Sequence, residues 1–302
     1  MPKQTLFFTN PYYLRTENKQ LKFVCKDSGE EHTRPIEDLG YLILDHPQLS
    51  LSQRTMQHLM ANRVAVIYCN DKHLPCSMSL PLDGHYLQGE RFRRQITAGQ
   101  VLKKQLWKQT IEAKIANQAQ LLDRYGLPTV PMQRWQKQVL SGDTTNREAL
   151  ASRHYWTHLF TPHLTGFTRQ RYGAPPNNLL NYGYAILRAA MARALVGAGL
   201  LCTLGIHHHN RYNAFCLADD MMEPYRPFVD YLVWEWIDNY GTPPAELTPG
   251  IKRTLLSIVT LDTVTPRGTS PLEVAVESTA RRLADCFEGT HRKLHFATLP
   301  TP

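Results

Sequence analysis

The chain has 302 residues, enough for two domains of ordinary size, and 42% of them are hydrophobic while 20% are charged. This balance is typical of a globular protein, and it excludes a chain that is mainly disordered or of low complexity. The formal net charge of +8 favours a polyanionic partner, such as nucleic acid or an anionic surface.

Cysteine usage and the N-terminal segment indicate the compartment. The six cysteines are scattered and form no CxxC pair, which is typical of reduced thiols in a cytosolic protein. The first residues show no apolar stretch followed by a small-residue cleavage site, and no run of about 20 apolar residues occurs. We therefore expect a cytoplasmic protein that is neither secreted nor membrane-spanning.

Short strands are predicted between Thr5 and Met78. The apolar runs TLFF, LKFVC, GYLILD and VAVIYCN are each bounded by Asn, Asp, Pro or Gly. One helix is predicted at Ser52 to Asn62, where apolar residues recur at helical spacing and Ser50 or Ser52 can cap the first turn. This part of the chain is therefore expected to form a β-rich, β-sandwich-like domain.

A change of pattern follows the segment PCSMSLPLDGH, whose two prolines and glycine are typical of a linker. We predict an α+β protein with a β-rich domain at 1–80, a linker at 81–90 and a larger all-α domain at 91–302. The first helix is expected at Arg91 to Tyr125, before Gly126 and Pro128, and the last dozen residues as a loose tail. Further helices are predicted at 132–140, 146–160, 178–196, 217–239, 248–261 and 271–287.

Positive charge is concentrated at residues 84–138, where ten Lys or Arg stand against three acids, a local charge of +7. Such a stretch suits a surface that follows a phosphate backbone, and a solvated helix face is the alternative. The DNA-contact candidates in it are Arg91, Arg93, Arg94, Lys103, Lys104 and Lys108.

Glu148 is the first candidate for chemistry, in the segment TTNREALASRHYW. A carboxylate here is a candidate metal ligand. The spacing from Thr145 to Glu148 is also that of a capping box, in which the Glu side chain reaches back to the start of its helix. The residues alone leave both roles open.

Three consecutive histidines, His207, His208 and His209, follow an apolar element in GIHHHN. Neighbouring residues on an extended segment point to opposite faces, so the run can offer one or two ligands to a single metal. An exposed histidine cluster without function is the alternative.

Asp219, Asp220 and Glu223 lie at i,i+3 and i,i+4 spacing, which places both aspartates beside the glutamate on a helix. Like charges so close favour a bound cation, and an acidic first helical turn favoured by the helix dipole is the alternative. Carboxylates with one imidazole suit Mg²⁺ or Mn²⁺ and phosphoryl-transfer chemistry. The chain has no P-loop, no GxSxG and no GxGxxG after a strand, so the sequence offers no support for ATP use.

In their order along the chain, these segments resemble the CRISPR-associated integrase family, the first and most widespread of the Cas proteins, and especially its type II members. The resemblance covers residues 110–240, with weaker support from IEDLGYLIL and DKHLPCSMSL in the N-terminal domain. It rests on KIANQ from Lys114, TTNREALASRHYW, LNYGYAILRAA from Leu180, GIHHHN, and LADDMMEPYRPFVD from Leu217.

The resemblance implies an N-terminal β domain that pairs two subunits and a helical domain that holds one divalent metal, Mg²⁺ or Mn²⁺. The family's ligands are a Glu in the segment matching TTNREAL, the His that closes a Gly-x-x-His step, and an acid before Pro-x-x-Pro. They correspond here to Glu148, His208 and Glu223, with Asp220 as a supporting acid. The triple histidine departs from the pattern and leaves His207 or His209 as alternatives to His208.

The implied activity is spacer acquisition, in which each 3′ hydroxyl of a prespacer attacks a phosphodiester at the edge of a repeat, together with DNA endonuclease activity. The implied partners are double-stranded prespacer DNA, repeat DNA, a second copy of the chain, the small second Cas protein and the type II effector nuclease, with no membrane. The expected location is the prokaryotic cytoplasm, at the nucleoid when acting. Asn181 and Tyr182 join the basic residues as candidate DNA contacts.

Two rival functions stay open. A metal-dependent DNA hydrolase would use the same ligands with water as the attacking group. A non-catalytic DNA scaffold would use the basic stretch alone, and the acids would then be helix caps and surface charge.

Overall fold

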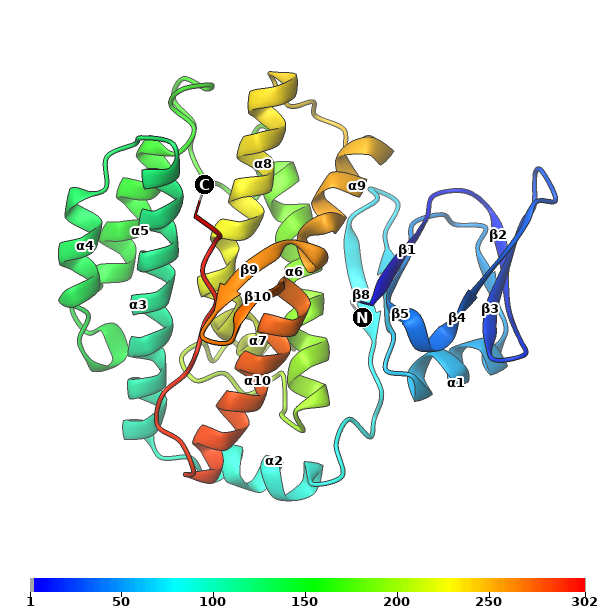
Figure 1. The fold of residues 1–302 in the computed structure, drawn as a ribbon, viewed down its shortest axis with the longest axis horizontal. Helices are drawn as coiled ribbons and strands as arrows, with labels where there is room; N and C mark the ends of the chain where they lie inside the picture. Colours follow the sequence, from blue (N-terminus) through cyan, green and yellow to red (C-terminus); the bar gives the residue numbers. More distant parts are fainter. Residues whose placement is uncertain (1–2, 302) are drawn as a thin grey trace. The chain divides into compact units, whose positions relative to one another are not determined.

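The computed structural model describes residues 3–301 and divides into two compact units, which join between Tyr86 and Leu87. That junction lies inside the segment 81–90. The first unit is rich in strands and the second is mainly helical, so the protein has an α+β fold (Figure 1). No helix among the described residues is both long and apolar enough to span a bilayer.

The first unit contains two four-stranded sheets. In the first sheet, β1 and β7 run parallel to β5 on either side of it, and β8 pairs antiparallel with β7. The strands of this sheet are β1 (Gln4–Phe8), β5 (Leu39–Leu44), β7 (Ala65–Cys69) and β8 (Pro75–Ser79). The second sheet has the order β4 (Glu31–Pro35), β3 (Gln20–Cys25), β2 (Tyr12–Glu17) and β6 (Ser50–Leu51).

Both sheets contribute to one apolar core. Leu21, Leu42 and Val66 from the strands are fully buried there with Leu59 of the helix α1 (Gln53–Ala61). The predicted cap of this helix is confirmed, because the Ser52 hydroxyl accepts a hydrogen bond from the backbone N–H of Thr55. Sandwich packing of the sheets stays a prediction. The PCSMS segment is the edge strand β8 and not part of a linker, because its backbone pairs with β7.

The long helix predicted at 91–125 is two helices, α2 (Gln88–Thr97) and α3 (Gln100–Arg124). The chain leaves helical geometry at Ala98, whose φ of −56° and ψ of 123° are extended, and Gly99 follows. Glycine has a low helix propensity, and the periodicity of the flanking residues hid the break.

Four helices pack against α6 (Asn177–Gly197), which is buried along most of its length. They are α7 (Cys216–Met222), α8 (Arg226–Tyr240), α9 (Pro249–Leu256) and α10 (Leu272–Glu288). The helices α4 (Val130–Lys137) and α5 (Arg147–His158) lie beside α3 instead (Figure 1). The expectation of an all-α unit is wrong in one respect, since β9 (Asp262–Thr265) and β10 (Gly268–Pro271) form a hairpin.

The predicted helix 217–239 is interrupted where its acidic residues lie. A short 3₁₀ turn, η3 (Glu223–Tyr225), separates α7 from α8. Pro224 and Pro227 explain the interruption, because proline has no N–H to donate within a helix and is tolerated only in a first turn. The break places Glu223 at the start of a new turn, and the interior of α3 contacts this turn.

The C-terminal segment is not loose. It runs along α3, where the side-chain amide of Gln120 donates to the Leu299 carbonyl at 2.7 Å and accepts from the Leu299 N–H at 3.1 Å. Gln109 binds the backbone of Arg292 and Leu294 in the same way. Side chains of α3 therefore pair with backbone N–H and C=O groups of the C-terminal segment, which lies outside any helix or sheet. Side-chain contacts of this kind produce no periodic pattern in the sequence.

Candidate active site

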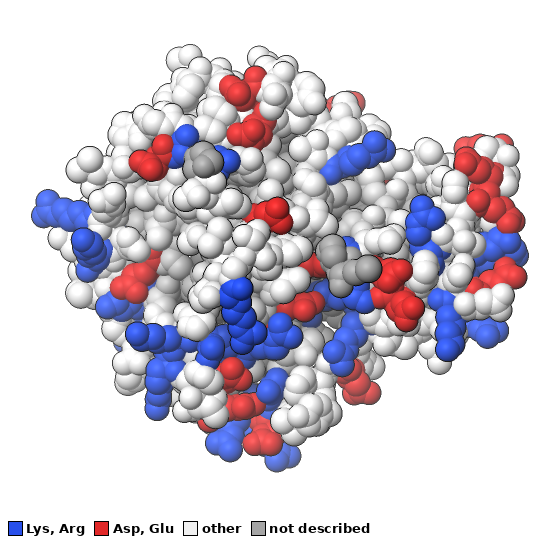
Figure 2. Space-filling view, viewed as in Figure 1, with Lys and Arg blue, Asp and Glu red and all other residues white. Residues whose placement is uncertain are grey.

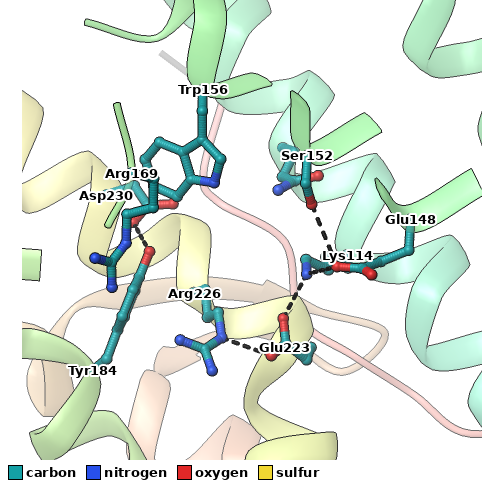
Figure 3. Close-up of a pocket in the computed structure, with 10 residues that line it drawn as sticks. Lys114, Glu148, Ser152, Trp156, Arg169, Tyr184, Glu223, Arg226 and Asp230 are labelled. Carbon is teal, nitrogen blue, oxygen red and sulfur yellow. Dashed lines mark hydrogen bonds and ion pairs between the residues drawn. The ribbon is translucent and has the colours of Figure 1, made fainter. Parts of the chain in front are cut away.

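A pocket of about 220 Å³ in the helical unit gathers charged residues from five segments (Figure 3). Two of the three predicted ligands, Glu148 and Glu223, line it. Its other lining residues are Lys114, Gln118, Ser152, Trp156, Arg169, Tyr184, Arg226 and Asp230.

Glu148 does not cap its helix. The carboxylate of Asp143 takes that role, accepting hydrogen bonds from the backbone N–H groups of Arg147 at 2.9 Å and Glu148 at 3.0 Å. The Glu148 side chain is therefore free to turn inward from α5, and its Oε1 lies 2.5 Å from Nζ of Lys114. Of the two roles that the sequence leaves open, the structure removes the capping box.

Lys114 lies between the two glutamates (Figure 3). Its Nζ, carried by the middle of α3, is 2.5 Å from Glu148 Oε1 and 2.7 Å from Glu223 Oε2. Burial alone would lower the pKa of this ammonium, but the fields of Glu223 and Glu148 outweigh burial and raise it. The two carboxylates thus converge on one point, where a positive charge already lies.

Glu223 is almost fully buried and keeps its negative charge. Burial favours its neutral form, yet Arg226 and Lys114 lower its pKa to about 2. Arg226 donates from Nε to Glu223 Oε1 at 2.8 Å. The buried Asn117, one helical turn after Lys114, donates to the Pro224 carbonyl at 2.7 Å and so fixes the turn that carries Glu223.

His208 is held by Asp220, which is fully buried on α7. The carboxylate of Asp220 contacts Nδ1 of His208 at 2.5 Å and also accepts from the backbone N–H of His207 at 2.9 Å. The hydrogen bond with Asp220 is the main cause that raises the pKa of His208, and the field of Glu223 adds to it. Nε2 of His208 takes no part in this bond, and the side chain is 51% exposed. Contact between a histidine and a buried carboxylate is the arrangement that orients a metal-binding imidazole.

Gly205 makes this arrangement sterically feasible. A Cβ at this position would lie 2.3 Å from the His208 carbonyl oxygen and 2.8 Å from Asp220 Oδ2. Any side chain would therefore push the histidine segment away from Asp220.

His207 has a different environment. Its ring stacks on Trp107 with a centroid distance of 4.1 Å and an interplanar angle of 1°. Burial is the main cause that lowers its pKa, and the neighbouring His208 adds to the effect. The structure thus distinguishes the two rings, one packed on an aromatic face and the other held by a carboxylate.

The structure does not place all the predicted ligands in one coordination shell. Among residues 3–301, no three His, Cys, Asp or Glu side chains already stand in a metal-binding arrangement. The acidic trio is also divided, since Asp219 contacts Arg188 at 2.6 Å, Asp220 contacts His208, and Glu223 contacts Lys114. The three acids therefore have three different partners, and Glu223 is the one that lines the pocket.

Three of the DNA-contact candidates have internal roles. Tyr182 is fully buried and is therefore unsuited to DNA contact. Arg91 is 13% exposed, because it donates to Glu288 at 2.8 Å and to the Ala198 carbonyl at 2.8 Å. Asn181 accepts from Arg169 at 2.7 Å, which makes it a support for that arginine.

The remaining basic candidates are more accessible. Arg93, Arg94 and Lys104 are exposed, while Lys103 and Lys108 are partly exposed. Figure 2 shows Lys and Arg side chains gathering in the lower part of the helical unit, where Figure 1 draws α2 and the ends of α3 and α10, with acids among them. Because their charged groups can reach solvent, these five residues remain candidates for DNA contact.

The family model described as CRISPR associated protein Cas1 matches residues 6–261. The chain belongs to the Cas1 family. A CRISPR-associated endonuclease Cas1 from Neisseria meningitidis is 36% identical over 85% of this chain and 83% of its own length. Another, from Pyrobaculum aerophilum, is 26% identical over 85% of this chain and 90% of its own length.

Two solved structures share the fold of this Cas1 family member. A casposase bound to integration product superposes with a TM-score of 0.81 at 20% identity, covering 100% of this chain and 94% of the other. A CAS1 protein from Thermotoga maritima gives a TM-score of 0.75 at 14% identity, covering 95% of this chain and 97% of the other. The family membership and the endonuclease relatives support a nuclease or integrase as the class of enzyme.

Sequence reasoning missed the cationic side of the pocket. Arg226 follows Glu223 at i,i+3 spacing, which is a usable signal for a helical contact, whereas Arg169 lies in a loop and gives none. Both guanidinium groups lie over the ring of Tyr184, at 4.6 Å for Arg226 and 5.4 Å for Arg169.

Asp230 lies fully buried behind Tyr184. It accepts hydrogen bonds from the hydroxyls of Tyr184 at 2.5 Å and Tyr155 at 2.7 Å. Burial is the dominant effect and raises its pKa to about 6, although both tyrosine hydrogen bonds oppose the shift.

This pKa predicts a pH-dependent difference between the protein and its Asp230→Asn variant. The folded pKa of about 6 lies above the reference of 3.8, so the folded state binds the proton more tightly between these values. The native protein should therefore lose about 2 kcal/mol relative to the variant as pH rises from 4 to 7. Urea unfolding of both proteins across this range measures the difference. A difference that stays constant with pH would contradict the shifted pKa.

The two environments of the histidines predict unequal effects on metal binding. His208→Ala should weaken Mn²⁺ binding at least tenfold, because it removes an imidazole that Asp220 orients. His207→Ala should change the affinity less than threefold, since that ring packs on Trp107. Titration calorimetry compares the two affinities, and equal effects would contradict the assignment.

Proposed function

We propose that this chain is a spacer-acquisition integrase, which transfers prespacer 3′ hydroxyls into a repeat array with the help of one divalent ion. The observation that carries the proposal is the convergence of Glu148 and Glu223 on a single buried cation position. Two carboxylates from separate elements lie close together here, one of them buried and the other partly exposed, and a positive charge between them stabilises the pair.

The donor chemistry of the residues suits Mg²⁺ or Mn²⁺. Glu148 and Glu223 supply hard oxygen ligands, and His208 supplies an imidazole that Asp220 supports. These three would hold the ion, with Asp220 outside the shell. When bound, such an ion polarises a phosphodiester and stabilises the charge of the attacking and leaving oxygens.

The other residues of the pocket act on the substrate. Lys114 and Arg226 bring positive charge next to the carboxylates, where a scissile phosphate would lie. The attack of a 3′ hydroxyl on a phosphodiester forms one such bond and breaks another. The reaction therefore needs no nucleotide hydrolysis, consistent with the absence of a P-loop motif in the sequence.

The relatives support the proposed partners. One solved structure is named as a casposase bound to integration product, and another, with a TM-score of 0.74, as a Cas6-RT-Cas1–Cas2 complex. We accordingly propose prespacer and repeat DNA as substrates, and a homodimer that assembles with the small second Cas protein. A link to the type II effector nuclease and the cytoplasmic, nucleoid-associated location are further parts of the proposal.

The products of one reaction distinguish joining from hydrolysis. With Mg²⁺ or Mn²⁺ and the small partner, we expect the chain to join a labelled duplex with 3′ hydroxyls to a plasmid that carries a repeat. The same duplex with 3′-dideoxy ends should give no joined product. Cut but never branched DNA would favour the hydrolase instead.

A further inference from the structure

The pocket has a second side that no ligand of the proposed ion occupies. It consists of Arg169, from the loop before α6, and Arg226, at the start of α8, with the ring of Tyr184 beside both guanidinium groups (Figure 3). Trp156 lies above Arg169 in the same view. This side faces the pocket that the two glutamates line.

Arg226 has unused hydrogen-bond donors. Its Nε binds Glu223, and among residues 3–301 this is the hydrogen bond found for the guanidinium group, so the two terminal nitrogens keep their donors. A guanidinium carries five N–H donors in a planar fork that matches the oxygens of a phosphate. Glu223 therefore fixes one edge of this group and leaves the other edge for a ligand.

Arg169 is positioned by a buried support. Asn177 is 2% exposed, and its Oδ1 accepts from Arg169 Nη1 at 2.9 Å and from the Gln170 N–H at 2.9 Å. Its Nδ2 donates to the carbonyls of Thr168 and Ala174. Gly173 gives this amide room, because a Cβ there would lie 2.6 Å from Asn177 Nδ2.

The loop thus closes around one asparagine and holds the arginine at the pocket. Asn181, one turn further along α6, accepts a second bond from Arg169, at Nη2. Because both terminal nitrogens of Arg169 are held by amide oxygens and not by a carboxylate, its positive charge is oriented without being neutralised. Asn177 is buried and all its side-chain hydrogen bonds are satisfied, and this arrangement fixes the position of Arg169. Such support favours a functional role for the arginine.

The charges of the pocket leave room for an anion. Lys114, Arg169 and Arg226 balance Glu148, Glu223 and Asp230, so a divalent ion would make the pocket positive. Among residues 3–301, the Asp230 oxygens accept hydrogen bonds from the hydroxyls of Tyr184 and Tyr155 and from neither arginine. A phosphodiester that enters between the carboxylates and the arginines would complete the balance.

We propose that Arg169 and Arg226 form a phosphodiester subsite, which binds a nonbridging oxygen of the DNA strand and presents the adjoining phosphate to the two glutamates. This subsite rests on the proposed function, since it assumes DNA as the substrate. It assigns Asn177 and Asn181 as positioning residues for Arg169.

The test measures binding in EDTA, so that its outcome does not depend on catalysis. Short duplexes with 3′-hydroxyl overhangs carry a single neutral methylphosphonate linkage, moved one step at a time from the 3′ end. For the unchanged full chain we expect one linkage at which loss of charge weakens binding about tenfold, as for a charge-assisted hydrogen bond. Fluorescence anisotropy gives the dissociation constants.

Arg169→Gln should bind all-phosphate DNA about tenfold more weakly and show no further loss at that linkage. Arg171→Gln is the matched control, because Arg171 lies two residues away in the same loop and is exposed, beside Tyr172. It should keep the profile of the unchanged chain. Arg169→Lys should keep the dependence of binding on salt concentration but recover only part of the affinity, since it retains the charge without the fork.

Arg226→Lys keeps a charge beside Glu223 and should weaken binding severalfold at unchanged thermal stability. Unchanged affinity in this variant would remove Arg226 from the subsite. A methylphosphonate profile in Arg169→Gln identical to that of the unchanged chain would overturn the proposal. Failure of the integrase proposal is distinguishable from failure of the subsite. In that case the joining reaction gives cut but unjoined DNA, whatever the methylphosphonate scan shows for binding.

Discussion

Glu223→Gln is expected to reduce strand transfer by at least about 10³-fold, while DNA binding changes less than threefold. The carboxylate is one of two that converge on the cation position, and its charge is maintained by Arg226 and Lys114. Loss of a ligand removes several kcal/mol of transition-state stabilisation, and each 1.4 kcal/mol is about one power of ten in rate. Gel analysis of joined products and a filter-binding titration measure the two quantities.

Glu112→Gln is the matched control for this variant. Glu112 lies on α3 and forms an i,i+4 ion pair with Lys108 at 3.6 Å, with both side chains partly exposed. Its replacement should leave strand transfer within about twofold. If Glu223→Gln joins DNA as well as the unchanged chain, the acids have no catalytic role and the scaffold interpretation is correct.

Lys114→Met is expected to lower the free energy of unfolding by about 3 kcal/mol in EDTA, because it leaves two carboxylates close together without the ammonium between them. Methionine retains most of the side-chain volume, so the loss reports charge more than packing. Denaturant unfolding of both proteins gives the difference.

Mn²⁺ should reverse this loss. A divalent ion takes the position of the ammonium, so Mn²⁺ at 100 times its dissociation constant should restore about 2.7 kcal/mol to Lys114→Met. The unchanged chain should gain less, because the ion must displace Nζ of Lys114. Lys108→Met, on the same helix, should lose less than 1 kcal/mol and show no special response to Mn²⁺. Equal responses of all three proteins would contradict a shared position for ion and ammonium.

The division of the chain into a β-rich and a helical part followed from local patterns. Short apolar runs up to Met78 predict strands, and helical periodicity beyond residue 90 predicts helices. Both patterns lie within a few neighbouring residues, so the sequence alone reveals them. The helix break at Gly99 was missed, because the apolar pattern continues across it and only the low helix propensity of glycine marks it. Pro224 and Pro227 are compatible with a kink, but the predicted helix 217–239 was not divided at Pro224, because its apolar pattern also continues.

The candidate site could be predicted in part from the sequence. Glu148 and Glu223 stood out as acids in recognisable segments. Lys114, the partner that joins them, was noted only as the start of the KIANQ segment, and no role in the site was predicted for it. Arg169 had no signal at all, because its position depends on Asn177 and on a loop that closes around it. Contacts between distant segments depend on tertiary packing, and a single sequence gives no periodicity for them.

The most direct test of a centre formed by Glu148, His208 and Glu223 is the stoichiometry of Mn²⁺ binding, measured by electron paramagnetic resonance on the full chain. We expect one tightly bound ion per chain in the unchanged protein, and loss of that ion in Glu148→Gln and in Glu223→Gln. One ion per chain retained in both variants, with unchanged affinity, would show that these carboxylates do not hold the metal.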